Sequence, residues 1–149
     1  MAIVIDQGTY AMKAGLSNSE KPTITRPPVG PATYYHKNVD VRAIENGVVV
    51  NWDVMTRIWE TLFTEELHVV PEDHSLILTE RVLMPSASRR KAAEIMFETF
   101  KVPRLRIANQ ATASMVSFGL TEGICVDVGS GLSVAPCSFQ ISPHATRFE

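Results

Sequence analysis

Apolar residues recur along the chain with two different spacings, which predict β-strands and α-helices in alternation. The first apolar run, Ile3-Val4-Ile5, is β-branched, as is typical of a strand that is buried on both faces. Pro27 and Pro28 end the strand that is expected over residues 23–25, because proline lacks the N–H that a strand needs. The segments expected to form strands are residues 2–6, 12–16, 23–25, 48–50, 75–79, 104–108 and 139–141, with a further hairpin at 123–137.

Two longer segments, residues 51–66 and 85–100, have apolar side chains at helical spacing, so one face of each helix is apolar. The first stripe consists of Met55, Ile58, Trp59, Leu62 and Phe63. The second stripe consists of Ala92, Ile95, Met96 and Thr99. We expect the two tryptophans, Trp52 and Trp59, to pack in the core.

The residues at the helix ends support these assignments. Asn51 is expected to cap the first helix, since its side chain can accept a hydrogen bond from a free N–H of the first turn. Ser86 or Ser88 is expected to cap the second helix in the same way. A third, short helix is expected over residues 110–118, closed by Gly119.

Strands and helices in this order predict an α/β fold, a mixed β-sheet flanked by helices. The 149 residues suit a single domain, residues 1–149, and the composition, 45% hydrophobic and 20% charged, is that of a globular protein. The net charge of −2 argues against nucleic acid or a membrane surface as the main partner. The basic cluster Arg89-Arg90-Lys91 is expected to be the solvated start of a helix, and no apolar run has the length of a membrane span.

The two cysteines, Cys125 and Cys137, are too few and too scattered to predict a disulfide framework. Cys125 falls within a strand that is predicted to be buried. A reducing, intracellular setting is the simpler interpretation. Asp6 interrupts the short apolar start of the chain, so no signal peptide is predicted.

The first two strands enclose a turn whose residues suit phosphate binding. Asp6 ends the first strand, and Gly8, Thr9 and Lys13 follow within reach. Glycine is expected here because it reaches positive φ without a steric penalty. The backbone N–H groups of such a turn can bind an anion, a carboxylate can hold a metal through water, and lysine can meet a phosphate as a point charge.

Residues 123–134 repeat this design with Asp127, Gly129, Ser130 and Gly131. Two such hairpins could hold one phosphate group between them. The alternative is that the glycines and aspartates are present because the hairpins need them to turn.

With this second hairpin, the chain resembles the N-terminal part of the actin and actin-related protein family over nearly its whole length. The other matching segments are Asn51-Trp52-Asp53-Val54-Met55, Ile58-Trp59, Leu78-Thr79-Glu80, Ile95-Met96-Phe97-Glu98-Thr99-Phe100, and Gln110-Ala111 with Ser114. The resemblance implies a ribonuclease-H-like domain of the actin ATPase type, one of two such domains that flank an ATP cleft. Few residues separate Pro31 from Arg42, so the small mobile subdomain of actins is expected to be deleted there, and the second half of the actin fold is expected to be absent.

The resemblance also implies roles for individual residues. Phosphate contacts would fall on the two turns, and Asp6, Gln110 and Asp127 would lie near the metal and the attacking water. The residues that would form a partial or vestigial ATP phosphate site are Asp6, Gly8, Thr9, Lys13, Asp127, Gly129, Ser130 and Gly131.

The chain departs from the actin pattern at three places. Ser130 stands where actins carry a second aspartate, and Asn46 stands where they carry a histidine before Gly47. The histidine that helps to position water is missing near Ser133 and Val134. Because phosphoryl transfer needs charge stabilisation from both sides of the cleft, autonomous ATP hydrolysis is not expected and no catalytic residue or protein metal site is assigned. Binding of Mg-ATP is the alternative to a chain without a cofactor.

The expected function is that of a truncated actin-like structural subunit, held in a larger cytoskeletal, ciliary or chromatin-associated assembly and unable to form filaments. The alternatives are an ATP-binding actin-like subunit and a regulator that binds actin monomers or filament ends. Partners would be other proteins, including actin or an actin-related protein, and the location cytoplasmic and cytoskeletal, with the cilium or nucleus as alternatives. The candidates for an uncovered apolar face are Met115, Val116, Phe118, Phe139 and Ile141.

Overall fold

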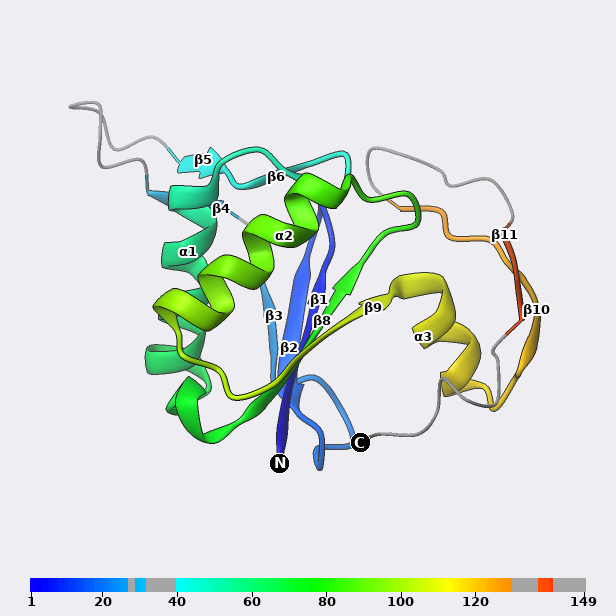
Figure 1. The fold of residues 1–149 in the computed structure, drawn as a ribbon, viewed down its shortest axis with the longest axis horizontal. Coiled ribbons are helices and arrows are strands. Elements are labelled where there is room, and N and C mark those ends of the chain that lie inside the picture. The colour runs from blue at the N-terminus through cyan, green and yellow to red at the C-terminus, as the bar shows by residue number, and fades with distance from the viewer. Residues whose placement is uncertain (27–28, 32–39, 130–136, 141–149) are drawn as a thin grey trace.

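A mixed sheet of five strands forms the centre of the protein in a computed structural model that describes residues 1–26, 29–31, 40–129 and 137–140 (Figure 1). Its strands are β1 (Ala2–Gln7), β2 (Met12–Leu16), β3 (Ile24–Arg26), β8 (Ser75–Glu80) and β9 (Leu105–Asn109). They lie in the order β3-β2-β1-β8-β9. The first three strands are antiparallel, whereas β1, β8 and β9 run parallel. The predicted mixed α/β fold is therefore confirmed.

The helices lie on both sides of this sheet, with α1 and α2 on one side and α3 on the other (Figure 1). The two long helices end in π-helical turns, and one 3₁₀ turn, η2 (Pro71–Asp73), precedes β8. The helical elements are α1 (Trp52–Thr61), its continuation η1 (Leu62–Glu66), α2 (Ser86–Glu94), its continuation η3 (Ile95–Thr99), and α3 (Gln110–Ser117). In the described part of the chain, none of these helices combines the length and the apolar character that crossing a membrane requires.

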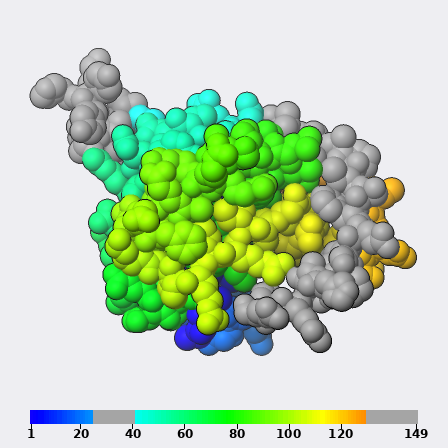
Figure 2. All heavy atoms as spheres, viewed as in Figure 1, coloured from blue at the N-terminus to red at the C-terminus, as the bar shows by residue number. Residues whose placement is uncertain are grey.

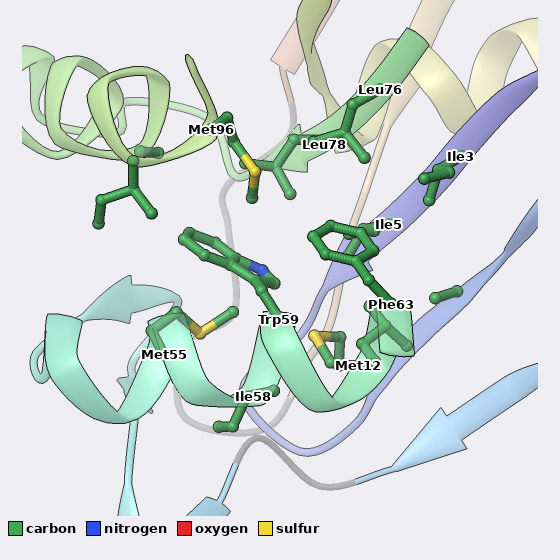
Figure 3. Packing of buried hydrophobic residues seen from close by; sticks show 14 of the residues in the cluster. Ile3, Ile5, Met12, Met55, Ile58, Trp59, Phe63, Leu76, Leu78 and Met96 are labelled. Carbon is green, nitrogen blue, oxygen red and sulfur yellow. The ribbon is translucent and has the colours of Figure 1, made fainter. Parts of the chain in front are cut away.

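The core lies between the sheet and the helices α1 and α2. Side chains of a strand alternate between its two faces, so Ile3 and Ile5 of β1 are buried against these helices. Trp59 of α1 is fully buried, and Figure 3 shows its ring among side chains from the facing elements. Trp52 is partly buried and packs against the same cluster. Both tryptophans therefore pack in the core, as predicted.

The helix caps agree with prediction in α1 but not in α2. The Asn51 side chain accepts a hydrogen bond of 3.0 Å from the N–H of Val54, as expected. The expectation that Ser86 or Ser88 caps α2 is wrong. Pro85 occupies the cap position with an extended backbone. The N–H of Ser88 donates to the carbonyl of Pro85, and no side chain caps the helix.

An ion pair joins the sheet to α2. Arg89 contacts Glu80 through two nitrogens of its guanidinium group: Nε donates to Glu80 Oε2 at 3.0 Å, and Nη2 donates to Oε1. This hydrogen bond, together with the negative charge of Glu80, raises the pKa of Arg89. Lys91 pairs instead with Glu94 at 2.6 Å. The predicted solvated cluster at this helix start is therefore exposed but also makes specific contacts.

Two short hairpins follow the central antiparallel strands. One pairs β4 (Val29–Pro31) with β5 (Asp40–Arg42), and the other pairs β6 (Ile44–Glu45) with β7 (Val48–Val49). Residues 32–39 lie outside the described residues, so the deletion of a small subdomain stays a prediction. The second hairpin turns at Asn46-Gly47 with φ of 48° and 75°, as in a type I′ turn.

A separate two-stranded ribbon pairs β10 (Glu122–Cys125) with β11 (Cys137–Gln140). The strand around Cys125 was predicted to be buried, and this is wrong: Ile124 is 69% exposed and Cys125 only partly buried. β10 is exposed because in the described chain its one strand neighbour is β11, although α3 covers it near Gly123. In the space-filling view residues of β10 lie at the margin of the molecule (Figure 2).

The predicted uncovered apolar face is confirmed in part. Val116 and Phe118 of the α3 region are exposed, but Met115 is buried beneath β10, with its Cε 3.5 Å from where a Cβ of Gly123 would lie. Phe139 lies within β11, and Ile141 falls outside the described residues. Gly119 adopts φ of 70° and closes α3 as predicted.

Candidate functional site

A cavity of about 1160 Å³ lies on the side of the sheet opposite α1 and α2 and joins the two predicted phosphate-binding turns. The strand alternation that buries Ile3 and Ile5 turns Val4 and Asp6 towards this cavity. The predicted site residues that line it are Asp6, Gly8, Thr9, Lys13, Gln110, Asp127 and Gly129. Ser130 and Gly131 fall outside the described residues. The structure thus brings together residues from both hairpins, as the sequence predicts.

Asp6 is held by two side chains from distant parts of the sequence. The hydroxyl of Thr79 donates to Asp6 Oδ1 at 2.5 Å, and Gln110 Nε2 donates to the same oxygen at 3.0 Å. Thr79 Oγ1 also accepts the N–H of Gln7 at 3.3 Å. These bonds fix the orientation of the Asp6 carboxylate, which lines the cavity. Thr79, which lies on β8 and is buried, was missed by the analysis of candidate site residues.

Thr9 is positioned by the Asn46-Gly47 turn. The N–H of Gly47 donates to Thr9 Oγ1 at 2.7 Å, so the threonine hydroxyl keeps its own proton to donate to a ligand. Gly47 cannot be replaced without strain, because its φ is +75° and a Cβ would lie 2.6 Å from Arg81 Cδ. The Asn46-Gly47 turn, at which the chain departs from actins, therefore supports the first predicted phosphate-binding turn.

Gly8 is needed for a reason other than the predicted one. It does not adopt the positive φ that was expected, since in the described chain the glycines with positive φ are Gly47, Gly119 and Gly123. Instead, a Cβ at Gly8 would lie 2.5 Å from the backbone oxygen of Ala11. The constraint is the close approach of two backbone segments within the turn.

Three cationic residues, Lys13, Lys21 and Arg81, line the cavity. Lys13 is directly opposite Asp6 in the β1–β2 ladder, which places both on the same face of the sheet. Arg81, immediately after β8, was missed by the sequence analysis. Its Nε is buried and has no hydrogen-bond partner within the described residues. A cation directly after a strand that ends at the site is the signal that could have identified it.

The residues present fit a magnesium–phosphate group. Mg²⁺ is usually bound by one or two carboxylates together with phosphate oxygens and water, and Asp6 and Asp127 supply two carboxylates to the cavity. Lys13 and Arg81 supply the positive charge that a polyphosphate needs. Within the described residues, no group of three or more histidine, cysteine or acidic side chains could hold a metal by itself. A metal here would therefore depend on the phosphates for part of its coordination.

Comparison with known proteins agrees with this geometry. A model of the family described as Actin matches residues 1–138. The chain is 36% identical over 154 residues to actin-like protein 7A of Bos taurus, covering 89% of this chain and 35% of that protein. It is 34% identical over 161 residues to actin-like protein 7B of Rattus norvegicus, covering 92% of this chain and 39% of that protein.

The chain spans little more than a third of the length of these curated relatives. The matched part includes both turns that line the cavity, the buried helix stripe of α1 and the strands of the mixed sheet. This sheet with its flanking helices is the ribonuclease-H-like arrangement of the actin type. The chain belongs to the actin family.

Proposed function

We propose that the protein acts as a non-enzymatic, actin-like structural subunit that is held in a larger protein assembly by an apolar surface. The observation that carries this proposal is a set of exposed apolar side chains at the end of α3, in β10 and in the residues that follow each of them, which we call the α3–β10 face. These side chains are 51–80% exposed and comprise Val116, Phe118, Leu120, Ile124, Val126 and Val128.

The arrangement of this face suits a protein partner better than solvent. Ile124 lies in β10, and Val126 and Val128 follow it at alternate positions just beyond the strand. Exposed apolar side chains gathered on neighbouring elements often mark a protein–protein contact, because monomeric proteins rarely leave a large apolar patch open to water. The chain's net charge of −2 gives little electrostatic attraction, which favours a contact driven by apolar burial.

The test is affinity purification of the tagged full chain from its native source, with Ile124→Asp as the face variant. Val70→Asp is the matched control, since Val70 is similarly exposed and lies away from the face. We expect a fixed set of proteins that is lost with Ile124→Asp and retained with Val70→Asp. Recovery of the same set with both variants would overturn the proposal. Recovery of conventional actin alone would favour a regulator of actin monomers or filament ends.

A second candidate function is binding of a Mg-nucleotide without autonomous hydrolysis, and the cavity between the two turns favours it. The carboxylates of Asp6 and Asp127 would contact the metal. The cations Lys13 and Arg81 and the hydroxyl of Thr9 would contact the phosphates. Ser130, in place of an acidic residue, argues against hydrolysis. Bound nucleotide would then stabilise the subunit rather than drive a cycle.

Thermal unfolding in Mg-ATP tests this second function. A ligand at about a hundred times its Kd adds roughly 2.7 kcal/mol of stability, which raises the Tm of a chain of this size by about 5–10 °C. We expect the shift to be lost in Asp6→Ala and in Lys13→Ala and to persist in Arg90→Ala, an exposed cation on α2. No shift in the unaltered protein would rule out the nucleotide site. Release of phosphate at catalytic rates would overturn the non-enzymatic proposal.

A further inference from the structure

The β10–β11 ribbon places the chain's two cysteines directly opposite one another. The register of this antiparallel pair runs from Glu122 opposite Gln140 to Cys125 opposite Cys137. The two residues are separated in the sequence by the segment that contains the second phosphate-binding turn. The two cysteines are therefore distant in the sequence but form a cross-strand pair in the fold.

The backbone geometry of such a pair suits a disulfide bond. Directly opposed residues in antiparallel strands have Cα atoms about 4.5–5.5 Å apart, in hydrogen-bonded and non-hydrogen-bonded positions alike. Disulfides join residues with Cα separations of about 4.4–6.8 Å. Opposed residues also share one face of a ribbon. Cys125 and Cys137 thus meet the backbone requirement without a shift of either strand.

Cys125 is also accessible to a small oxidant. Cys125 is a free cysteine and is only partly buried, and its neighbours Ile124 and Val126 are largely exposed. The ribbon has two strands in the described chain, and a two-stranded sheet is marginally stable by itself. A covalent link across it would therefore have a measurable effect on its stability.

We propose that Cys125 and Cys137 form a reversible intramolecular disulfide that fixes the β10–β11 ribbon. A low-molecular-weight disulfide such as oxidised glutathione serves as the oxidant. One protein thiolate attacks it, one glutathione thiol leaves, and the second protein thiolate displaces the other. One protein S–S bond forms, the S–S bond of the oxidant breaks, and the two hydrogens of the protein thiols pass to the two released glutathione molecules.

The bond would act on two features of the fold. It lies at the end of the strand that carries Ile124, so oxidation would fix part of the α3–β10 face, and this consequence rests on the proposed structural function. It also holds together the strand ends on either side of Asp127 and Gly129, which line the cavity. Formation of the bond itself depends on neither proposed function.

Treatment of the folded full chain with oxidised glutathione tests the proposal. We expect loss of both free thiols in a thiol titration, and an intact mass that falls by two hydrogens and carries no glutathione. A Cys125–Cys137 cross-link should appear in the peptide map, and dithiothreitol should reverse it. The Tm of the oxidised protein should rise by several degrees, on the order of 5 °C.

The variants Cys125→Ser and Cys137→Ser are the controls, and each should show no oxidation-dependent rise in Tm. Glutathione adducts on both cysteines of the wild type, or disulfide-linked dimers in place of the cross-link, would overturn the proposal. Affinity purification with the oxidised and reduced protein then measures the effect on partners separately. A cross-link that leaves partner recovery unchanged would refute only the effect on the face.

Discussion

Replacement of Trp59 by alanine tests the description of the core most directly. Trp59 is fully buried, and its ring packs edge-on against Phe100 with the ring centroids 6.4 Å apart. Its indole Nε1 is buried and lacks a hydrogen-bond partner within the described residues. The substitution therefore removes a large apolar group and an aromatic contact, together with one unsatisfied polar group.

The expected loss of stability follows from these contributions. Replacing a buried Trp or Phe by Ala costs about 3–5 kcal/mol of stability. Because Trp59 also loses its edge-on aromatic contact, its cost before any offset lies at the upper end of that range. Relief of the unsatisfied N–H offsets about 1–3 kcal/mol. We expect a net loss of about 3 kcal/mol, which lowers the Tm by about 6–12 °C in a chain of this size.

Denaturant and thermal unfolding followed by circular dichroism measure this loss. Trp52→Ala is the matched control, because Trp52 only packs against the edge of the core and should cost less. Trp59→Phe should recover more than half of the stability, since it keeps an aromatic ring and removes the unpaired N–H. The reasoning would be refuted if Trp59→Ala unfolded at the same temperature as the wild type and lost only a protein partner.

Three further substitutions test the contacts that join the elements. Arg89→Ala should lower the Tm more than Arg90→Ala in thermal unfolding, because it leaves the nearly buried carboxylate of Glu80 without its cation; equal effects would show that the pair contributes nothing. Gly8→Ala should destabilise the protein by about 1–3 kcal/mol in denaturant unfolding, since its Cβ would lie 2.5 Å from a backbone oxygen. Asn51→Ala should cost about 1 kcal/mol through loss of the α1 cap, and Asn51→Asp should restore most of it.

Local signals in the sequence predicted the elements that depend on near neighbours. The β1–β2 hairpin follows from its β-branched apolar run and the turn at Gly8, and α1 follows from its stripe and from the Asn51 cap. The Asn46-Gly47 turn had an equally strong hairpin signal in its Asn-Gly pair, but only the strand over residues 48–50 was predicted there. The serine cap of α2 failed because Pro85 supplies an extended residue at that position.

The parts of the site that were missed depend on which distant strands become neighbours. Asp6 was identified from the first turn and Gln110 through the family resemblance, whereas Thr79 and Arg81 reach the cavity because β8 lies beside β1. The pairing of the cysteines likewise depends on a register set across a long connection. No local spacing encodes these contacts, since register is fixed by how the whole sheet buries its apolar face.

The hydrogen bonds around Asp6 have a consequence for the order of folding. They join residues 73 and 104 positions apart in the sequence, so they form only after β1, β8 and the start of α3 have come together. Contacts of such long sequence separation form slowly, because the entropy of closing the intervening loops must first be overcome. The Asp6 network is therefore completed late, after local elements such as the β1–β2 hairpin and α1. Any ligand that requires this network will bind only molecules whose parallel strands are already joined.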